Sequence, residues 1–280
     1  MNNFELYKLR QAGLTNHQII NILDYEAKYQ KSLSLRDRAV VSKCNNPAIF
    51  MEKYRQLNTK QLREAFLRFP SISILDAAYP LELKEIYNPP VLLFYQGDIS
   101  LLQKPKLAVV GARKCSDLGT KSVQKVITEL GNRFVIVSGL ARGIDTAAHL
   151  SALKNGGTTI GVIGTGLDVF YPAENQKLQA FMMTNHLVIS EYGPGEAPLK
   201  YHFPERNRII AGLSRGIVVA EAKLRSGSLI TCERALEEGR DVFAIPGNML
   251  DGKSAGCLHL IQEGAKCIVS GFDILDDYQF

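Results

Sequence analysis

The sequence predicts an α/β protein in which a doubly wound, mainly parallel sheet follows a small all-α domain. From residue 107 onward, apolar runs of four to six residues alternate with helical segments and Gly-rich turns. Continuous apolar runs are typical of strands buried on both faces, as in parallel sheets. The first 70 or so residues instead read as short helices. We therefore expect a helical domain over 1–70 and an α/β domain over 71–280.

The N-terminal segment is expected to form a bundle of three to five short helices. Thr15 and Gln18 stand at the spacing of a capping box, directly ahead of a group of Ile and Leu residues. Further helices are expected near 47–56 and 59–68. Two interpretations of this bundle stay open: a folding appendage, or a module that contacts protein or DNA.

Strands are expected where short apolar runs precede Gly turns or follow helical segments. The first of them leads into the α/β domain after a stretch punctuated by Pro. The expected strands are 91–97, 107–110, 134–137, 158–163, 187–190, 216–220, 241–245 and 266–269.

The composition excludes a membrane protein and indicates the cytoplasm. No apolar stretch approaches the roughly 18 residues that a membrane span needs, and the N-terminus has no apolar signal region. The five Cys are scattered without a C-x-x-C pair, as in a reduced protein. The net charge of +5 is uneven, because residues 1–75 hold 12 Lys and Arg against 6 Asp and Glu, and the rest hold 21 against 22. Only local clusters can therefore make the α/β domain attractive to anions.

Three Gly-rich turns carry the strongest functional signal. They read GARKCS, SGLARGID and GTGLDVFYP, and each follows an expected strand. In a parallel sheet such turns meet at the carboxyl edge, where open α/β sheets bind ligands. Backbone N–H groups at Gly turns and helix N-termini suit phosphate oxygens. The sequence therefore predicts a phosphate-bearing ligand held by several turns, with Arg113 as a phosphate contact or, alternatively, the partner of a neighbouring acid.

Residues near these turns have two interpretations each. Asp145 is expected to cap the helix that follows it, with a catalytic carboxylate as the alternative, and His149 is expected to pack inside that helix, with a catalytic role as the alternative. Tyr171 is either a base-stacking residue or part of the core. The segment 202–216 is expected to place Arg208 and Arg215 on one helix face, as a phosphate-binding or merely solvated surface.

The sequence argues against two nucleotide-binding motifs. The turn GTGLDV lacks the third Gly of the dinucleotide fingerprint. Residues 247–254 match the P-loop pattern formally, but only about 25 residues follow, too few for the metal-binding strand of a nucleoside triphosphatase. No metal-ligand spacing and no nucleophile elbow are present. We expect no cofactor, no metal and no catalytic residue.

The order of the motifs, taken together, resembles the DprA/Smf family. GARKCS, SGLARGIDTAAH, GTGLDVFYPAEN, the HFPERNRIIAGLS segment, RSGSLITCERALEEGRDVFAIPGN and GCLHLIQEGA follow one another as they do in that family of bacterial DNA-processing proteins. The resemblance covers about 80–280 densely, and residues 1–70 resemble the sterile-alpha-motif-like domain that some members carry.

This resemblance implies an extended Rossmann fold that binds single-stranded DNA without a nucleotide cofactor and is not an enzyme. It also implies a homodimer that loads the RecA recombinase onto incoming strands and protects them during natural transformation in competent cells. A family Lys after the Y-P turn is replaced by Ala173 here, which leaves Lys177 as the nearest candidate, and Lys253 is implied to be incidental. The implied DNA ligands are Gly111, Arg113, Ser138, Gly139, Arg142, Gly143, Gly166, Lys177, Arg206, Asn207, Arg208, Ser226, Gly227 and Ser228.

An alternative function is a nucleotide-handling enzyme of the phosphoribohydrolase type, with Glu233 as the acid in SGSLITCERALEEG. For the homodimer, the apolar residues of the C-terminal region are interface candidates, and ordinary core positions are the alternative. These candidates are Leu258, Leu260, Ile261 and Cys267.

Overall fold

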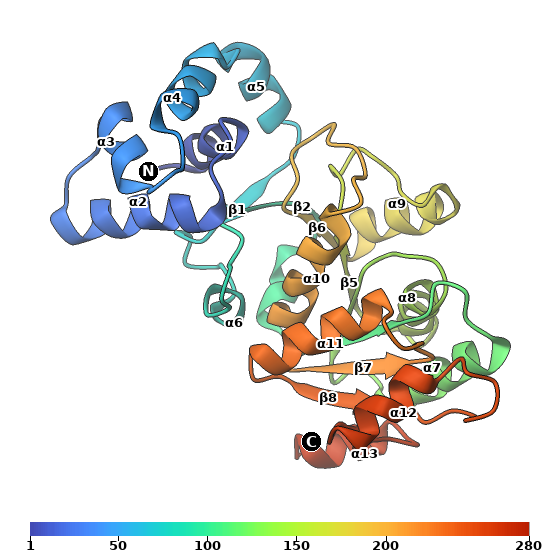
Figure 1. Ribbon diagram of the computed structural model, residues 1–280. Helices are drawn as coiled ribbons and strands as arrows, with labels where there is room; N and C mark the ends of the chain where they lie inside the picture. Colours follow the sequence, from blue (N-terminus) through green and yellow to red (C-terminus); the bar gives the residue numbers. More distant parts are fainter. Residues whose placement is uncertain (280) are drawn as a thin grey trace.

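A mixed sheet organises the molecule (Figure 1). The computed structural model describes residues 1–279, and over these it contains nine strands in the order β1-β2-β6-β5-β4-β3-β7-β8-β9. The pairs from β6 to β9 are parallel, which confirms the predicted sheet, whereas β1 and β2 add an antiparallel edge. The strands are β1 (Ser71–Ser73), β2 (Leu92–Gly97), β3 (Lys106–Gly111), β4 (Val135–Ser138), β5 (Thr159–Ile163), β6 (Leu187–Ser190), β7 (Gly216–Ala220), β8 (Asp241–Ala244) and β9 (Lys266–Cys267).

Helices α1–α5 form the N-terminal bundle, and the others accompany the sheet. None of the helices in residues 1–279 combines the length and apolar character needed to cross a bilayer. They are α1 (Asn3–Gln11), α2 (Asn16–Tyr29), α3 (Leu35–Val41), α4 (Pro47–Gln56), α5 (Thr59–Phe66), α6 (Leu81–Lys84), α7 (Asp117–Leu130), α8 (Ile144–Lys154), α9 (Gln176–Asn185), α10 (His202–Leu213), α11 (Gly227–Glu237), α12 (Ala255–Gln262) and α13 (Phe272–Asp277), with 3₁₀ turns η1 (Ile99–Gln103) and η2 (Ala173–Asn175).

Local sequence signals explain where the N-terminal helices begin. The predicted capping box is confirmed: Thr15 accepts from the backbone N–H of Gln18, and the Gln18 side chain accepts from the N–H of Thr15. Asn46 caps α4 and Asn58 caps α5 by accepting a backbone hydrogen bond three residues on. Such caps satisfy N–H groups that have no partner inside the helix.

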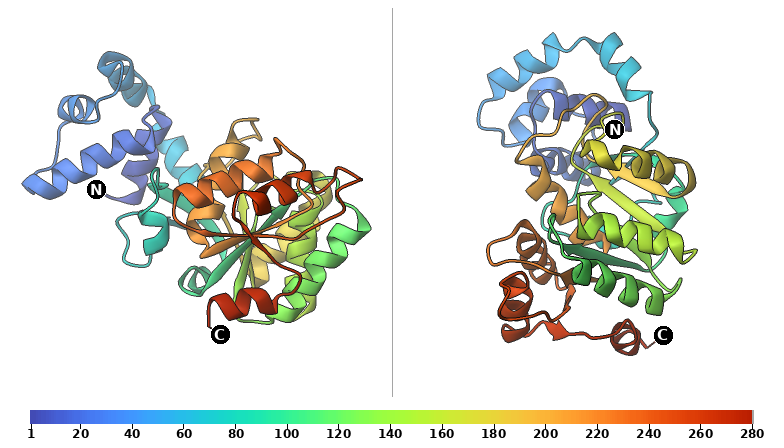
Figure 2. Two further views of the ribbon diagram at one scale, coloured as in Figure 1. Left: turned by 60° about the horizontal axis from the view of Figure 1, so that its bottom comes forward. Right: turned by 90° about the vertical axis from the view of Figure 1, so that its right-hand side faces the viewer.

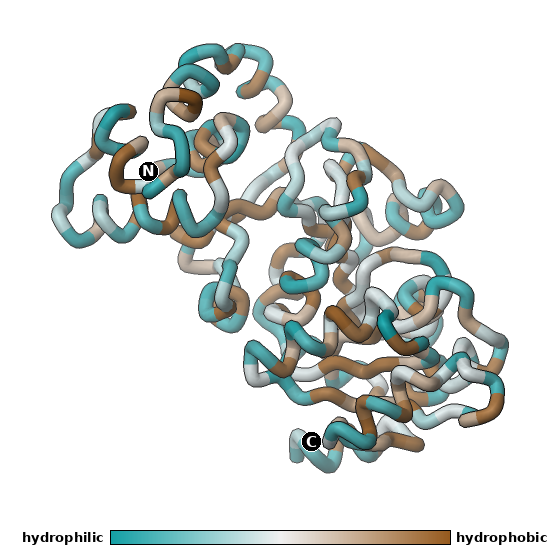
Figure 3. Tube along the Cα trace, viewed as in Figure 1, coloured by the Kyte–Doolittle hydropathy of each residue, from teal (hydrophilic) through white to brown (hydrophobic). Residues whose placement is uncertain are grey.

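Helices cover both faces of the sheet. On β3, Leu107 and Val109 face α7 and α8, whereas Ala108 and Val110 belong to the core on the α10 and α11 side. This alternation follows from the two-residue period of a strand, and the two helix layers flank the sheet in Figure 2. Because both faces are covered, the strands carry apolar residues throughout, as the brown course of β7 and β8 shows in Figure 3.

The N-terminal helices pack firmly on the antiparallel edge. Tyr7 of α1 meets Phe94 of β2 edge to face at 5.3 Å, inside a continuous apolar cluster. Beside it, the buried Glu191 after β6 pairs with Arg10 of α1 at 2.6 Å and with Arg208 of α10 at 2.5 Å. Burial acts to raise the pKa of Glu191, but the two guanidinium groups prevail and lower it to about 2. One ionised carboxylate therefore joins α1, β6 and α10.

The chain path creates a crevice between β3 and β7. From β3 the chain moves outward through β4, β5 and β6, and then α10 carries it back to β7 on the other side of β3. Neighbouring strands whose connections leave in opposite directions open a crevice at their carboxyl ends, the usual ligand site of such sheets. The turns after β3 and β7 border that crevice.

Two local predictions are wrong. Arg215 does not share a helix face with Arg208, because α10 ends at Leu213 and Arg215 precedes β7. Asp145 does not cap its helix: Gly143 occupies the N-cap position without a side-chain bond, and Asp145 lies inside α8. His149 is fully buried, as expected, and its Nδ1 lies 2.6 Å from Oγ1 of Thr159.

Candidate nucleic-acid interface

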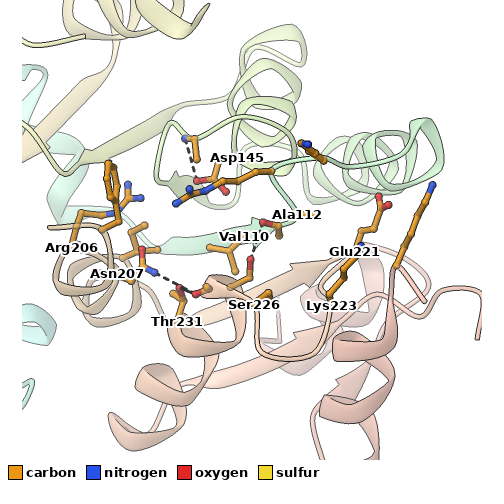
Figure 4. A pocket seen from close by; sticks show the side chains of 18 residues that line it. Val110, Ala112, Asp145, Arg206, Asn207, Glu221, Lys223, Ser226 and Thr231 are labelled. Carbon is orange, nitrogen blue, oxygen red and sulfur yellow. Dashed lines mark hydrogen bonds between the residues drawn. The ribbon is translucent and has the colours of Figure 1, made fainter. Parts of the chain in front are cut away.

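A cavity of about 490 Å³ occupies the crevice between β3 and β7. The turn after β3, the turn after β7 and the inner side of α10 form its walls (Figure 4). Of the implied DNA ligands, it brings together Gly111, Arg113, Arg206, Asn207, Ser226, Gly227 and Ser228.

The rim of this cavity is cationic. Arg113, Lys114, Lys223 and Lys253 are exposed there, and none of them forms an ion pair with another of residues 1–279. The acid Glu221 also lines the cavity, but its Oε2 accepts from the backbone N–H of Ser116 at 2.7 Å. The unpaired cations outnumber the acids, so the cavity attracts anions.

Arg113 extends this surface toward two aromatic rings. Its guanidinium lies 5.7 Å from the ring centre of Phe203, and Phe203 lies 5.4 Å from Tyr171, which is 45% exposed. Arg113 lines both the large cavity and an adjoining one of about 40 Å³, which Tyr171 and Phe203 also border. A cation beside partly exposed rings can contact a phosphate while a base stacks next to it.

Arg206 is a buried residue that shapes the site. Only 4% of it is exposed, and Nη1 donates to the carbonyl of Gly139 at 2.7 Å and to that of Val162. Asp145 accepts from the N–H of Gly139 at 3.1 Å and of Ala141 at 3.3 Å. Burial lowers the pKa of Arg206 to about 10 and raises the pKa of Asp145, each charge opposing the shift of the other. A DNA contact by Arg206 stays a prediction, and its visible contacts are internal.

The turns are joined to one another by hydrogen bonds and by close contacts between their backbones. Ser228 donates to the carbonyl of Gly111 at 2.8 Å, which ties the start of α11 to the end of β3. Gly143 has φ +75°, and a Cβ there would lie 2.2 Å from the carbonyl oxygen of Ala112. Asn207 donates to the carbonyl of Gly227 at 3.4 Å. These contacts explain why the turns need Gly and Ser residues, and they set the width of the crevice.

Other implied ligands lie outside the large cavity. Gly139 and Arg142 border the smaller cavity, and Arg142 pairs with Glu174 at 2.6 Å. Arg208 is held by Glu191. Four more residues line neither cavity. Ser138 is buried and donates to the Val109 carbonyl, and Lys177 is exposed on α9. The two glycines lie against backbone, Gly166 against Gly193 and Gly143 against Ala112.

Sequence reasoning missed several lining residues. Lys253, implied to be incidental, lines the large cavity together with Lys114, Lys223 and Phe203. Lys114 directly follows Arg113, and Lys223 lies between the strand at 216–220 and the Ser-Gly-Ser turn, so both had a positional signal. Lys253 had no positional signal beyond the P-loop-like pattern. Its position at the cavity depends on how the loop 247–254 folds back toward β7.

The enzymatic alternative finds no support in this geometry. Glu233 is exposed on α11 and lines neither cavity, so it does not face a ligand held there. Within residues 1–279, no group of three His, Cys, Asp or Glu side chains is placed to hold a metal ion.

The interface candidates divide into core and surface. Leu260 is 8% exposed and belongs to the main core cluster, which is the alternative interpretation. Leu258 is partly exposed on α12, Ile261 on the same helix is partly exposed but packs against that cluster, and Cys267 is exposed on β9. The latter three remain candidates for a contact between subunits.

A Rossmann-like sheet with a basic crevice at its switch point defines a protein of the α/β class whose crevice suits an anionic ligand. The chain belongs to the DNA recombination-mediator protein A family, whose model matches residues 71–279. The sterile alpha motif domain of DNA processing protein A matches residues 1–62, which identifies the N-terminal bundle.

Individual relatives agree with this assignment. The chain is 63% identical over 278 residues to the DNA processing protein DprA of Streptococcus pneumoniae, covering 99% of each chain. It is 46% identical to the Bacillus subtilis DprA, covering 74% of this chain and 70% of that one. The crystal structure of the pneumococcal protein matches with a TM-score of 0.97, over 99% of this chain and 98% of that one. A DNA processing protein A from Helicobacter pylori, studied for its single-stranded-DNA binding mode, matches with a TM-score of 0.68 at 29% identity, over 75% of this chain and 96% of that one.

Proposed function

We propose that this protein binds single-stranded DNA along the carboxyl edge of its sheet. The observation that carries the proposal is the cavity at the β3–β7 switch point, with its unpaired cationic rim and with Arg113 beside Phe203. The Helicobacter pylori relative, which binds single-stranded DNA, supports it.

The cationic and aromatic residues of the site have different roles in binding. Arg113, Lys114, Lys223 and Lys253 meet successive phosphates, and Arg113 is suited to a bidentate contact. Phe203 and Tyr171 offer their rings to the bases beside this track. Backbone contacts and stacking do not depend on base identity, so the protein binds without regard to sequence.

We further propose that the bound strand is protected from nucleases and passed to the RecA recombinase during natural transformation, by a homodimer. Membership in the recombination-mediator family supports this step. Holding a strand by its phosphates along a sheet edge shields the bonds that nucleases attack. A nuclease-protection assay and a RecA filament-assembly assay, each with and without this protein, test the two activities separately.

The decisive experiment measures anisotropy of a short fluorescent single strand. Arg113→Glu places a carboxylate among the phosphates, so we expect an affinity loss of about tenfold or more at low salt. Lys31→Glu makes the same charge change at an exposed site in the loop between α2 and α3 and serves as the matched control. Undiminished binding by Arg113→Glu, or no binding by the wild type, contradicts the proposal.

The division at residues 70 and 71 is also proposed as a folding boundary. The two family models leave residues 63–70 unmatched between them. Limited proteolysis that cuts within 63–70 and leaves both fragments intact would support this boundary.

A further inference from the structure

The amino edge of the sheet, opposite the crevice, carries a row of cations. Arg133 precedes β4, Lys104 and Lys106 stand at the start of β3, Arg215 precedes β7 and Arg240 precedes β8. The four strands are adjacent and parallel in the order β4-β3-β7-β8, so their amino ends lie side by side. At a strand spacing of about 4.8 Å the row extends for about 14 Å.

These cations line two adjoining hollows. One has a volume of about 420 Å³ and is bordered by Lys104, Lys106, Arg215 and Arg240. The other, of about 250 Å³, is bordered by Arg133 and also by Lys104, which joins the two. Burial lowers the pKa of Lys106, and Arg215 and Arg240 add to that effect while Glu82 opposes it. The positive charges are thus close enough to act on one another.

Internal partners neutralise only part of the row. Glu82 pairs with Lys106 at 2.5 Å, and the Arg240 guanidinium donates to the carbonyls of Glu82 and Gly212, so these two cations are structural. Asp241, at the start of β8, accepts from the Tyr278 hydroxyl at 2.8 Å, and the nearby Asp277 pairs with Lys266. The side chains of Lys104, Arg133 and Arg215 are exposed and form no ion pair with any other of residues 1–279.

We propose that this amino-edge groove is a second nucleic-acid site that binds a phosphodiester backbone. An elongated row of cations fits consecutive phosphates, which a strand of B-form DNA carries about every 3.4 Å along the helix axis. The lining of both hollows contains no aromatic side chain, in contrast to the carboxyl edge with Phe203 and Tyr171. Without rings for stacking, the groove recognises charge alone and accepts duplex as well as single-stranded backbone.

Arg133→Glu/Arg215→Glu tests the groove, because neither side chain has a hydrogen bond that the fold would lose within residues 1–279. Anisotropy is measured across a salt series with a short single strand and with a duplex of equal length. We expect the variant to bind duplex about tenfold more weakly at low salt, with the slope of log affinity against log salt reduced by about 1.8, for two lost phosphate contacts. Lys31→Glu/Arg36→Glu is the matched control for net charge.

An unchanged duplex affinity and slope in Arg133→Glu/Arg215→Glu would overturn the groove, as would an equal loss in the control or a wild type that binds no duplex. Loss of single-strand binding alone, with duplex binding intact, would also overturn it. The proposal does not depend on the carboxyl-edge site: Arg113→Glu tests that site by its single-strand affinity, so the two failures are distinguishable.

Discussion

Asp145 and Arg206 form hydrogen bonds with the backbone N–H and the backbone carbonyl of the same residue, Gly139. Oδ2 of Asp145 accepts from the N–H of Gly139 at 3.1 Å, and Nη1 of Arg206 donates to the carbonyl of Gly139 at 2.7 Å. A Cβ on residue 139 would lie 2.3 Å from that Nη1. A largely buried acid and a largely buried guanidinium therefore fix the turn after β4, and the turn places Arg142 and Ala141 at the cavities.

Arg206→Ala is expected to destabilise the protein, because the carbonyls of Gly139 and Val162 lose their donor and Asp145 loses its compensating charge. We expect a loss of about 2 to 4 kcal/mol in the free energy of unfolding. Arg113→Ala, at an exposed position, should change it by less than about 0.5 kcal/mol. Urea denaturation of the two variants measures this contrast, and equal stabilities would contradict the structural role of Arg206.

Phe203→Leu is expected to lower single-strand affinity by about 5- to 100-fold, through the loss of one stacked base. Leucine keeps an apolar side chain against Gly164, so the fold should be preserved. Anisotropy with a short single strand gives the readout. Phe181→Leu removes an exposed ring on α9 that lines neither cavity and should leave the affinity intact. A stacking role for Phe203 fails if both variants bind like the wild type.

The ionised Glu191 is expected to make stability depend on acid pH. Its pKa falls from an ordinary 4.5 to about 2 on folding, so its contribution is complete above about pH 4.5 and disappears as the pH falls toward 2. Roughly 3 kcal/mol of stability depends on this ionisation. Urea denaturation across this pH range should show the wild type approaching Glu191→Gln as the carboxylate takes up its proton. A gap between the two proteins that stays constant with pH would refute the ionised state.

Leu258→Glu is expected to convert the proposed dimer into a monomer, because it places a charge on the partly exposed side of α12. Light scattering at micromolar concentration reports the mass directly. Leu150→Glu makes the same kind of change on the exposed side of α8 and should leave the dimer intact. A wild type that already has the mass of a monomer would remove the basis for this interface.

The sheet was largely predictable because its signal is local. The runs at 187–190 and 216–220 coincide with β6 and β7, and the run at 107–110 lies within β3. A strand that is covered by helices on both faces carries a continuous apolar run, so such runs mark the strands clearly. The antiparallel pairing of β2 with β6 was not expected, because the direction of an edge strand depends on a distant partner rather than on its own residues.

The site was predictable in place but only partly in detail. The carboxyl edge followed from the order of strands and turns, and Arg113 lines the cavity. The sequence alone did not show that Arg206 is buried. Neighbouring residues of α10 point in different directions, and which direction faces the core depends on how the helix packs. Lys253 reaches the cavity through a loop fold that no periodicity describes.

The pairing of Glu191 with Arg10 and Arg208 limits how this protein can change its domain composition. A gene rearrangement that removed the N-terminal helices would take Arg10 and Asn16 from the carboxylate and leave Arg208 as its remaining partner. The residue at position 191 and the helical module are therefore expected to be gained or lost together in descendants of this chain. Chimeras built by exchanging N-terminal modules will need to exchange that residue as well.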